Sequence, residues 1–226
     1  MSCSRLAKRN RDKVDGRICY IGQMRLLSLL LLLCGAWGGC SARPPRIQHA
    51  TVDMGEASKL AFAQYDLDNN GAISKDEAVT FPVVQRRFSL FDQNRDGNVT
   101  AEEFKQRLVT IYGTHVALLS ATCIVTQKGR PLTGAVVRFV PEEFLAGAIP
   151  IAEGVVDRNG NAILSIKIED LPAGAPRVEG FIRPGLYRVV ITHPNREIPE
   201  KYNRETILGE DVSAETVIGG PFRFEL

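Results

Sequence analysis

A twelve-residue acidic pattern occurs twice in this chain of 226 residues and constrains its fold more than any other feature. The first copy runs from Asp66 to Glu77 and the second from Asp92 to Glu103. Both copies follow the spacing D-x-[DN]-x-[DN]-G-x5-E, which gathers oxygen-bearing side chains around a glycine turn. Aromatic residues precede both copies at the same two offsets, which marks an internal repeat: Phe62 and Tyr65, then Phe88 and Phe91.

The pattern matches the EF-hand calcium loop. Ca²⁺ takes about six to eight oxygen ligands, and glycine at the sixth position allows the sharp turn that wraps the loop around one ion. The two loops therefore predict two bound Ca²⁺ ions. The expected ligands are side-chain oxygens, together with the backbone carbonyl of the seventh residue and a water-mediated contact from the ninth. In loop order they are Asp66, Asp68, Asn70, Ala72, Ser74 and Glu77, followed by Asp92, Asn94, Asp96, Asn98, Thr100 and Glu103.

The methionine content bears on what these loops do. Calcium sensors expose a Met-rich groove, whereas Met54 is the sole methionine that follows the N-terminal segment. The sequence therefore favours sites filled by environmental calcium over a cytosolic sensor.

The residues around the loops, 53–113, are predicted to form an all-α EF-hand pair. Ile73 and Val99 occupy equivalent loop positions and are expected to pair as a short two-stranded bridge. Pro82 is suited to open the entering helix of the second hand, because the N–H that proline lacks has no helical partner there. Full entering helices in both hands favour a self-contained pair over a minimal dockerin.

The N-terminal region, residues 1–40, has the features of an export signal. Residues 1–25 hold seven Lys/Arg against two Asp/Glu, and a leucine-rich run follows at 26–33. That run is shorter than the about 20 apolar residues of a membrane span and has the length of a signal-peptide core. Met24 is interpreted as the true start, with a long basic n-region as the alternative. Because the excess of basic charge lies in this segment, no nucleic-acid binding is expected.

The sequence Gly38-Gly39-Cys40 resembles the lipobox of bacterial lipoproteins, in which the cysteine is acylated after cleavage. The resemblance implies lipidation at Cys40 and a membrane-anchored lipoprotein of the cell envelope. Trp37 stands where the family usually has leucine, which leaves an ordinary signal peptide or an uncleaved anchor as alternatives. Residues 41–52 are interpreted as a short tether.

The remaining residues, 114–226, change to a period of two, which is typical of half-buried strands. One alternating run covers 121–125, where a buried and unreactive Cys123 thiol is expected. The pair Asn159-Gly160 between two such runs is a hairpin signal. About seven short strands with glycine and proline turns predict an all-β sandwich. The fold class is thus multidomain α + β, with an EF-hand pair and a prealbumin-like or Ig-like sandwich.

Three segments of this half carry a family resemblance: Gly129-Arg-Pro-Leu-Thr-Gly134, Asp157-Arg-Asn-Gly160 and Pro184-Gly185-Leu-Tyr187. They resemble bacterial carboxypeptidase-regulatory-like, or transthyretin-like, β-sandwich domains over most of the half. The resemblance implies a non-catalytic accessory or adhesive module in the cell envelope and transfers no functional residue.

Some transthyretin-like proteins hydrolyse an intermediate of purine degradation, with a His/Arg constellation and a C-terminal Tyr-Arg-Gly-Ser type ending. This chain ends instead at Phe222–Leu226, with the sequence FRFEL. Its three histidines fall in the tether, at the junction and in a loop: His49, His115 and His193. The loop carboxylates are interpreted as exposed surface: Glu142, Glu143, Glu169 and Asp170. The sequence therefore predicts no enzyme.

These features predict an exported, lipid-anchored, non-catalytic calcium-binding protein. Calcium would order the EF-hand pair beside an accessory or adhesion sandwich, whose partner is a protein or polysaccharide that the sequence does not name. The alternative is a dockerin-like or accessory subunit of an envelope hydrolase complex, and a transthyretin-like hydrolase is disfavoured.

Overall fold

The protein is described by a computed structural model of residues 46–226, apart from residue 146. These residues belong to one compact unit, Pro45–Leu226. The predicted start at Met24, the leucine-rich run and Cys40 lie outside the described residues. Within the described part of the chain, no helix is long and apolar enough to cross a membrane.

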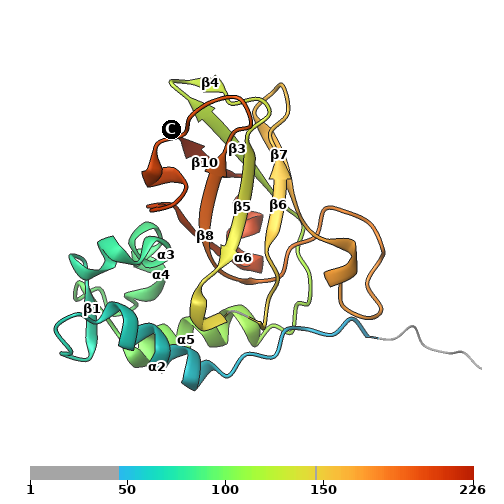
Figure 1. The fold of residues 1–226 in the computed structure, drawn as a ribbon. Coiled ribbons are helices and arrows are strands. Elements are labelled where there is room, and N and C mark those ends of the chain that lie inside the picture. The colour runs from blue at the N-terminus through green and yellow to red at the C-terminus, as the bar shows by residue number, and fades with distance from the viewer. Residues whose placement is uncertain (1–45, 146) are drawn as a thin grey trace, which may run out of the picture. The chain divides into compact units, whose positions relative to one another are not determined.

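The first part of the described chain is helical and holds two short strands (Figure 1). Its elements are α2 Met54–Tyr65, β1 Ala72–Ser74, the 3₁₀ helix η2 Glu77–Thr80, α3 Pro82–Arg86, α4 Phe88–Phe91, β2 Asn98–Thr100 and α5 Ala101–Tyr112. Asp53 caps α2, because its Oδ1 accepts hydrogen bonds from the N–H groups of the first turn. Ile73 pairs with Val99 in an antiparallel bridge between the loops, which confirms the prediction.

The prediction of a full entering helix is wrong for the second hand. Pro82 does open α3 as expected, but the helix stops at Arg87, and α4 is a separate short turn. Arg86 and Arg87 both contact the Glu210 carboxylate, at 2.5 and 3.0 Å. Neighbouring residues on a continuous helix do not face the same way, so a break at Arg87 lets both guanidinium groups reach one carboxylate.

The second part of the chain is rich in strands and contains one connected sheet. Its strands are β3 Ala121–Gln127, β4 Arg130–Pro131, β5 Val136–Pro141, β6 Ala152–Val155, β7 Asn161–Ile166, β8 Gly185–Thr192, β9 Gly209–Val212 and β10 Phe222–Glu225. The short helical elements are η3 Glu143–Leu145, η4 Ile168–Asp170, η5 Glu200–Tyr202 and α6 Ala214–Ile218. The strand order is β10-β3-β7-β6-β5-β8-β9, with β4 paired to β3.

The alternating run at 121–125 forms a strand with one buried side, as predicted. This strand, β3, buries Ala121, Cys123 and Val125. Burial raises the pKa of the Cys123 thiol to about 12, in agreement with an unreactive thiol. The Asn159-Gly160 turn connects β6 to antiparallel β7 as the hairpin signal predicted.

The sheet curls so that β5 and the edge strand β10 face each other across the core. Phe139 of β5 lies 5.7 Å from Phe222 and 6.1 Å from Phe224, measured between ring centroids. Those two phenylalanines belong to β10, which is four places away in the strand order. The curl arises at β7, since its first residues pair with β3 and its last residues pair with β6. A continuous curled sheet therefore encloses the β-rich core.

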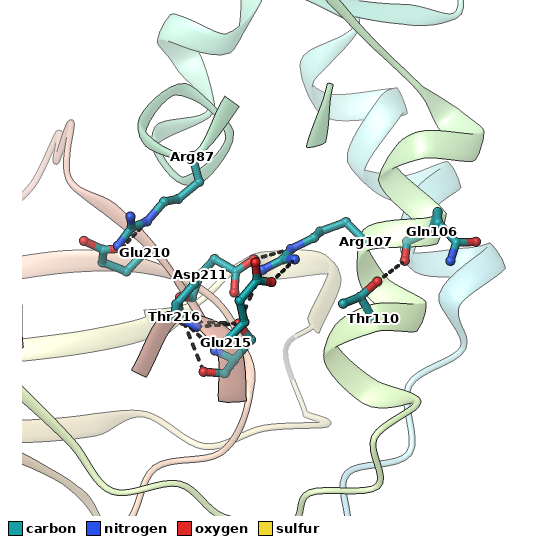
Figure 2. A network of polar contacts seen from close by, with 9 residues as sticks. Arg87, Gln106, Arg107, Thr110, Glu210, Asp211, Glu215 and Thr216 are labelled. Carbon is teal, nitrogen blue, oxygen red and sulfur yellow. Dashed lines mark hydrogen bonds and ion pairs between the residues drawn. The ribbon is translucent and has the colours of Figure 1, made fainter. Parts of the chain in front are cut away.

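The helical part and the β-rich part share one hydrophobic core. Helix α3 packs on the edge strand β9, where Gly209 lies directly against the backbone of Val83. A β-carbon at Gly209 would overlap that backbone, so glycine is required by the close approach. Ion pairs surround this contact, from Arg87 to Glu210 and from Arg107 to Asp211 (Figure 2). The described end of the predicted tether also packs on this unit, and Arg183 donates a hydrogen bond of 3.0 Å to the Gln48 carbonyl.

Candidate metal centre

The first residue of each loop is held by the turn that follows it. Asp66 Oδ1 accepts a hydrogen bond of 3.1 Å from the N–H of Asn70, and its Oδ2 accepts one of 2.9 Å from the N–H of Gly71. Asp92 accepts the equivalent bonds at 3.1 and 3.0 Å in the second loop. The two loops therefore have the same local geometry at the start.

The last residue of the first loop, Glu77, folds back across the loop. Its Oε1 accepts a bond of 2.8 Å from the N–H of Leu67, while its Oε2 accepts bonds of 2.9 and 2.8 Å from the N–H and hydroxyl of Ser74. The hydrogen bonds from Ser74, together with those from Asp68 and Leu67, lower the pKa of Glu77. The carboxylate is therefore ionised at neutral pH, as a calcium ligand must be.

Glu103 occupies the same place in the second loop. Its Oε2 accepts bonds of 2.9 and 2.7 Å from the N–H and hydroxyl of Thr100, which is also the N-cap of α5. Burial acts to raise the pKa of Glu103, but hydrogen bonds from Thr100, Asn94 and Gln93 outweigh it and leave the pKa lowered. The capping box of α5 thus positions the last predicted ligand of the loop.

The donor set of the first loop fits a divalent cation. Carboxylate oxygens of Asp66, Asp68 and Glu77 lie within 4.8 Å of one another. Ionised carboxylates repel when they are this close, and a hard cation between them removes the repulsion. Asn70 and Ser74 lie in the same loop and would complete an all-oxygen set, with the Ala72 carbonyl at the seventh position.

The second loop exchanges the residue types of the third and fifth positions, so that Asn94 comes before Asp96. The Asn94 amide donates a bond of 3.0 Å to Asp96, which is exposed, and Thr100 and Asn98 flank the inter-loop bridge. The amide oxygen of Asn94 remains a suitable neutral ligand for Ca²⁺.

Backbone conformation also matches the expectation at the sixth positions. Gly71 has φ of 85° and Gly97 has φ of 91°, a region that side chains strain to enter. The fourth positions are left-handed too, with φ of 57° at Asn69 and 62° at Arg95. The sequence pattern leaves the fourth position free, so it did not predict that the turn needs two such residues.

The contact between the first hand and the β-rich part was missed by sequence reasoning. Tyr65 directly precedes Asp66, and its ring stacks on Phe81 with centroids 3.9 Å apart. Its hydroxyl donates a hydrogen bond of 3.0 Å to Oε2 of Glu142. One signal was present: Tyr65 carries a hydroxyl where Phe91 does not, and a buried hydroxyl needs a partner.

Glu142 corrects the prediction that the loop carboxylates are exposed. Its side chain is fully buried, whereas Glu143, Glu169 and Asp170 are exposed as expected. Burial raises the pKa of Glu142 to about 7, while Arg188 and Tyr65 act in the opposite direction. Burial follows from the turn at η3, which directs Glu142 toward Tyr65.

The structure places two of the three histidines side by side. His49 and His115 come from segments that the sequence placed apart, yet their ring centroids lie 5.0 Å apart. His193 instead lies beside the carbonyl of Thr133, with Nε2 at 3.1 Å.

The comparisons with known proteins concern the helical part. The sequence model of the EF hand family matches residues 59–81 and 84–109. A curated relative, the calcineurin B subunit of Naegleria gruberi, is 45% identical over 76 residues, which cover 28% of this chain and 43% of that protein. The chain thus spans less than half the length of the curated relative it matches. No solved structure matches the chain. The helical part of this protein is an EF-hand region, and its relationship to these proteins supports calcium binding.

Proposed function

We propose that this protein binds two Ca²⁺ ions, one in each loop, and that it acts as a non-catalytic calcium-stabilised module. The observation that carries the proposal is the matched geometry of the loops. In both, the first and twelfth carboxylates accept the same set of hydrogen bonds from the loop backbone. Such pre-positioned oxygens lower the ordering cost of ion binding.

Calorimetric titration with Ca²⁺ tests the two sites. The wild-type chain should bind two ions, and Glu77→Gln and Glu103→Gln should each weaken one of them. Glu102→Gln is the matched control, because the side chain of Glu102 is 80% exposed and lies outside the ligand set. Absence of heat and of any gain in helix at millimolar calcium would refute the proposal.

The finer architecture belongs to the same proposal. We infer that the β-rich part is a prealbumin-like sandwich whose outer surface meets a protein or polysaccharide partner. The curl of the sheet, which brings Phe139 against Phe222 and Phe224, supports this architecture. A pull-down with the intact protein against envelope polysaccharides and proteins tests the partner, and loss of binding after calcium chelation would tie it to the loops.

We also infer an exported protein held at the cell envelope by a lipid on Cys40. The lipobox-like sequence and the leucine-rich run before it support the inference. Substitution Cys40→Ser should move the protein from the membrane fraction to the soluble fraction. Unchanged partitioning would refute lipidation and favour an uncleaved anchor.

A second candidate is a dockerin-like or accessory subunit of a hydrolase complex. The short α3 and α4 favour it, because they depart from the full entering helix of a self-contained pair. The relative's name, which is that of a subunit, agrees with a role beside another chain. Co-purification of a hydrolase that dissociates on chelation would favour this candidate, whereas a monomer with both ions bound would favour the first.

A further inference from the structure

We infer that the turn Glu142–Leu145 is the intramolecular target of the EF-hand pair, so that calcium binding and attachment of the β-rich part strengthen each other. The inference rests on the proposed calcium sites and names what those sites control. In this arrangement the EF-hand pair does not offer an open groove to a helix of another protein. Its apolar face is already in contact with Phe144 of the same chain.

Phe144 makes the central contact. Its ring meets Phe81 edge-to-face with centroids 6.0 Å apart, and Phe104 edge-to-face at 5.9 Å. Phe81 and Phe104 are themselves fully buried and come from the exit segments of the first and second hand. One side chain of the β-rich part therefore touches both hands.

Each hand residue that touches the turn lies within four residues of a predicted calcium ligand in the chain. Tyr65 precedes Asp66 and donates its hydroxyl hydrogen bond to Glu142. Phe104 follows Glu103, and the 3₁₀ helix that begins at Glu77 ends directly before Phe81. A shift of a ligand on ion binding is thus transmitted within one turn of backbone.

The turn is firmly attached to the β-rich part. It follows the last residue of β5, and the N–H of Glu142 donates a hydrogen bond of 3.0 Å to the carbonyl of Leu186 in β8. The N–H of Leu145 donates back to the Glu142 carbonyl at 2.8 Å, and the Leu145 side chain is buried. Motion of the turn relative to the sheet would break the hydrogen bond between Glu142 and Leu186, so the turn and the sheet move together.

The sign of the coupling follows from the docked geometry. In the structure the turn contacts both hands, and the carboxylate oxygens of the first loop lie within 4.8 Å of one another. Docking fixes Tyr65 and Phe104, which in turn restricts Asp66 and Glu103, and pre-organisation of this kind raises affinity. Linkage is reciprocal, so calcium must strengthen docking by the factor by which docking strengthens calcium binding.

Calcium titration of full-length Phe144→Ala tests the inference. Its affinity should fall by about fivefold or more, the lower end of typical coupling between sites. Phe181→Ala is the matched control, because Phe181 is also a partly buried phenylalanine of the β-rich part but lines a hollow with Arg46 and Leu118, away from the hands. Its affinity should stay within about twofold of the wild type.

The outcomes separate this inference from the proposed function. A wild type that binds no calcium refutes the calcium sites themselves. A wild type that binds, together with a folded Phe144→Ala variant of unchanged or higher affinity, overturns the intramolecular target alone. If Phe144→Ala does not fold, Phe144→Leu decides: it keeps an apolar side chain but loses two aromatic contacts, so affinity should fall by about two- to tenfold. Unchanged affinity there also overturns the inference.

Discussion

Arg107 of α5 places its Nε 2.8 Å from Oδ2 of Asp211 on β9, and both side chains are almost entirely buried. The same guanidinium donates a hydrogen bond of 2.8 Å to Glu215 (Figure 2). It also donates one of 3.3 Å to Ser213. Burial acts to lower the pKa of Arg107, but Asp211 and Glu215 outweigh it and leave the pKa raised. The exit helix of the second hand is therefore joined to the edge of the sheet by a charged and hydrogen-bonded contact.

Breaking this pair should destabilise the protein strongly. Arg107→Met leaves the Asp211 carboxylate buried without its partner, which costs about 3–5 kcal/mol in the free energy of unfolding. The double variant Arg107→Met/Asp211→Leu should recover most of that loss, because an apolar pair leaves no buried charge. Denaturant titration at fixed calcium measures both. Lys105→Met, at an exposed ion pair of the same helix, should stay within about 0.5 kcal/mol of the wild type.

A methyl group at Gly209 should weaken the contact between α3 and β9. The added β-carbon of Gly209→Ala would overlap the backbone of Val83, so we expect a loss of about 1–3 kcal/mol in unfolding free energy. Gly55→Ala is the control, because its nearest neighbour is the Asp53 side chain at 3.4 Å. Alanine is the better helix former there, and a gain of up to about 1 kcal/mol is expected. Equal stability of the two variants would contradict the close approach.

Glu142 should make stability depend on pH. Its pKa is raised by burial to about 7 from an ordinary value of 4.5, so the folded state holds the proton that the unfolded state releases. Its contribution to stability is therefore fully present below about pH 4.5 and lost as the pH rises through about 7, by up to about 3 kcal/mol. The charged and titratable groups that face Glu142 are Arg188, Tyr65 and Glu143.

Comparison with Glu142→Gln isolates this effect, since glutamine stays neutral at every pH. The free energies of unfolding of the wild type and the variant should agree at low pH and separate between about pH 4.5 and 7. Above that range the variant should be the more stable protein. Glu143→Gln, at an exposed neighbour, should follow the wild type throughout. Parallel curves for wild type and Glu142→Gln would rule out a raised pKa at this position.

The sixth position of the second loop should tolerate alanine poorly. Gly97 has φ of 91°, and a side chain in the left-handed region costs about 1–2 kcal/mol. If the loop relaxes to avoid this strain, the ligands separate, and calcium affinity at that site should fall by about tenfold. Gly129→Ala is the control, because its φ of 71° imposes a similar cost outside the hands, with no atom near the added carbon. That variant should lose stability but keep its calcium affinity, and weakened calcium binding there would contradict a local effect.

Sequence reasoning succeeded where the determinants are local. The loop from Asp66 to Glu77 and the bridge between Ile73 and Val99 follow from a short chain that must turn around its own glycine. The alternating strands were predicted for the same reason, because period-two burial is a property of neighbouring residues. In each case a few adjacent side chains carry the whole signal.

The failures concern residues whose partners are remote in the chain. The break at Arg87 and the burial of Glu142 both depend on groups more than forty residues away in sequence, at Glu210 and Tyr65. A glutamate in a turn or an arginine in a helix is ordinarily solvated, so no local pattern distinguishes these residues. The roles of Arg87 and Glu142 depend on which surfaces of the helical and β-rich parts pack against each other.

The amino-acid sequence by itself therefore determined the two EF-hand loops and the strand-rich second part, since both depend on spacing within about a dozen residues. Only the tertiary structure decided that these parts share one core, with Phe144 against both hands and Arg107 on Asp211. The physical reason is that a contact between remote segments depends on the packing of whole surfaces, which bury Glu142 and Asp211 only when the complete chain is folded.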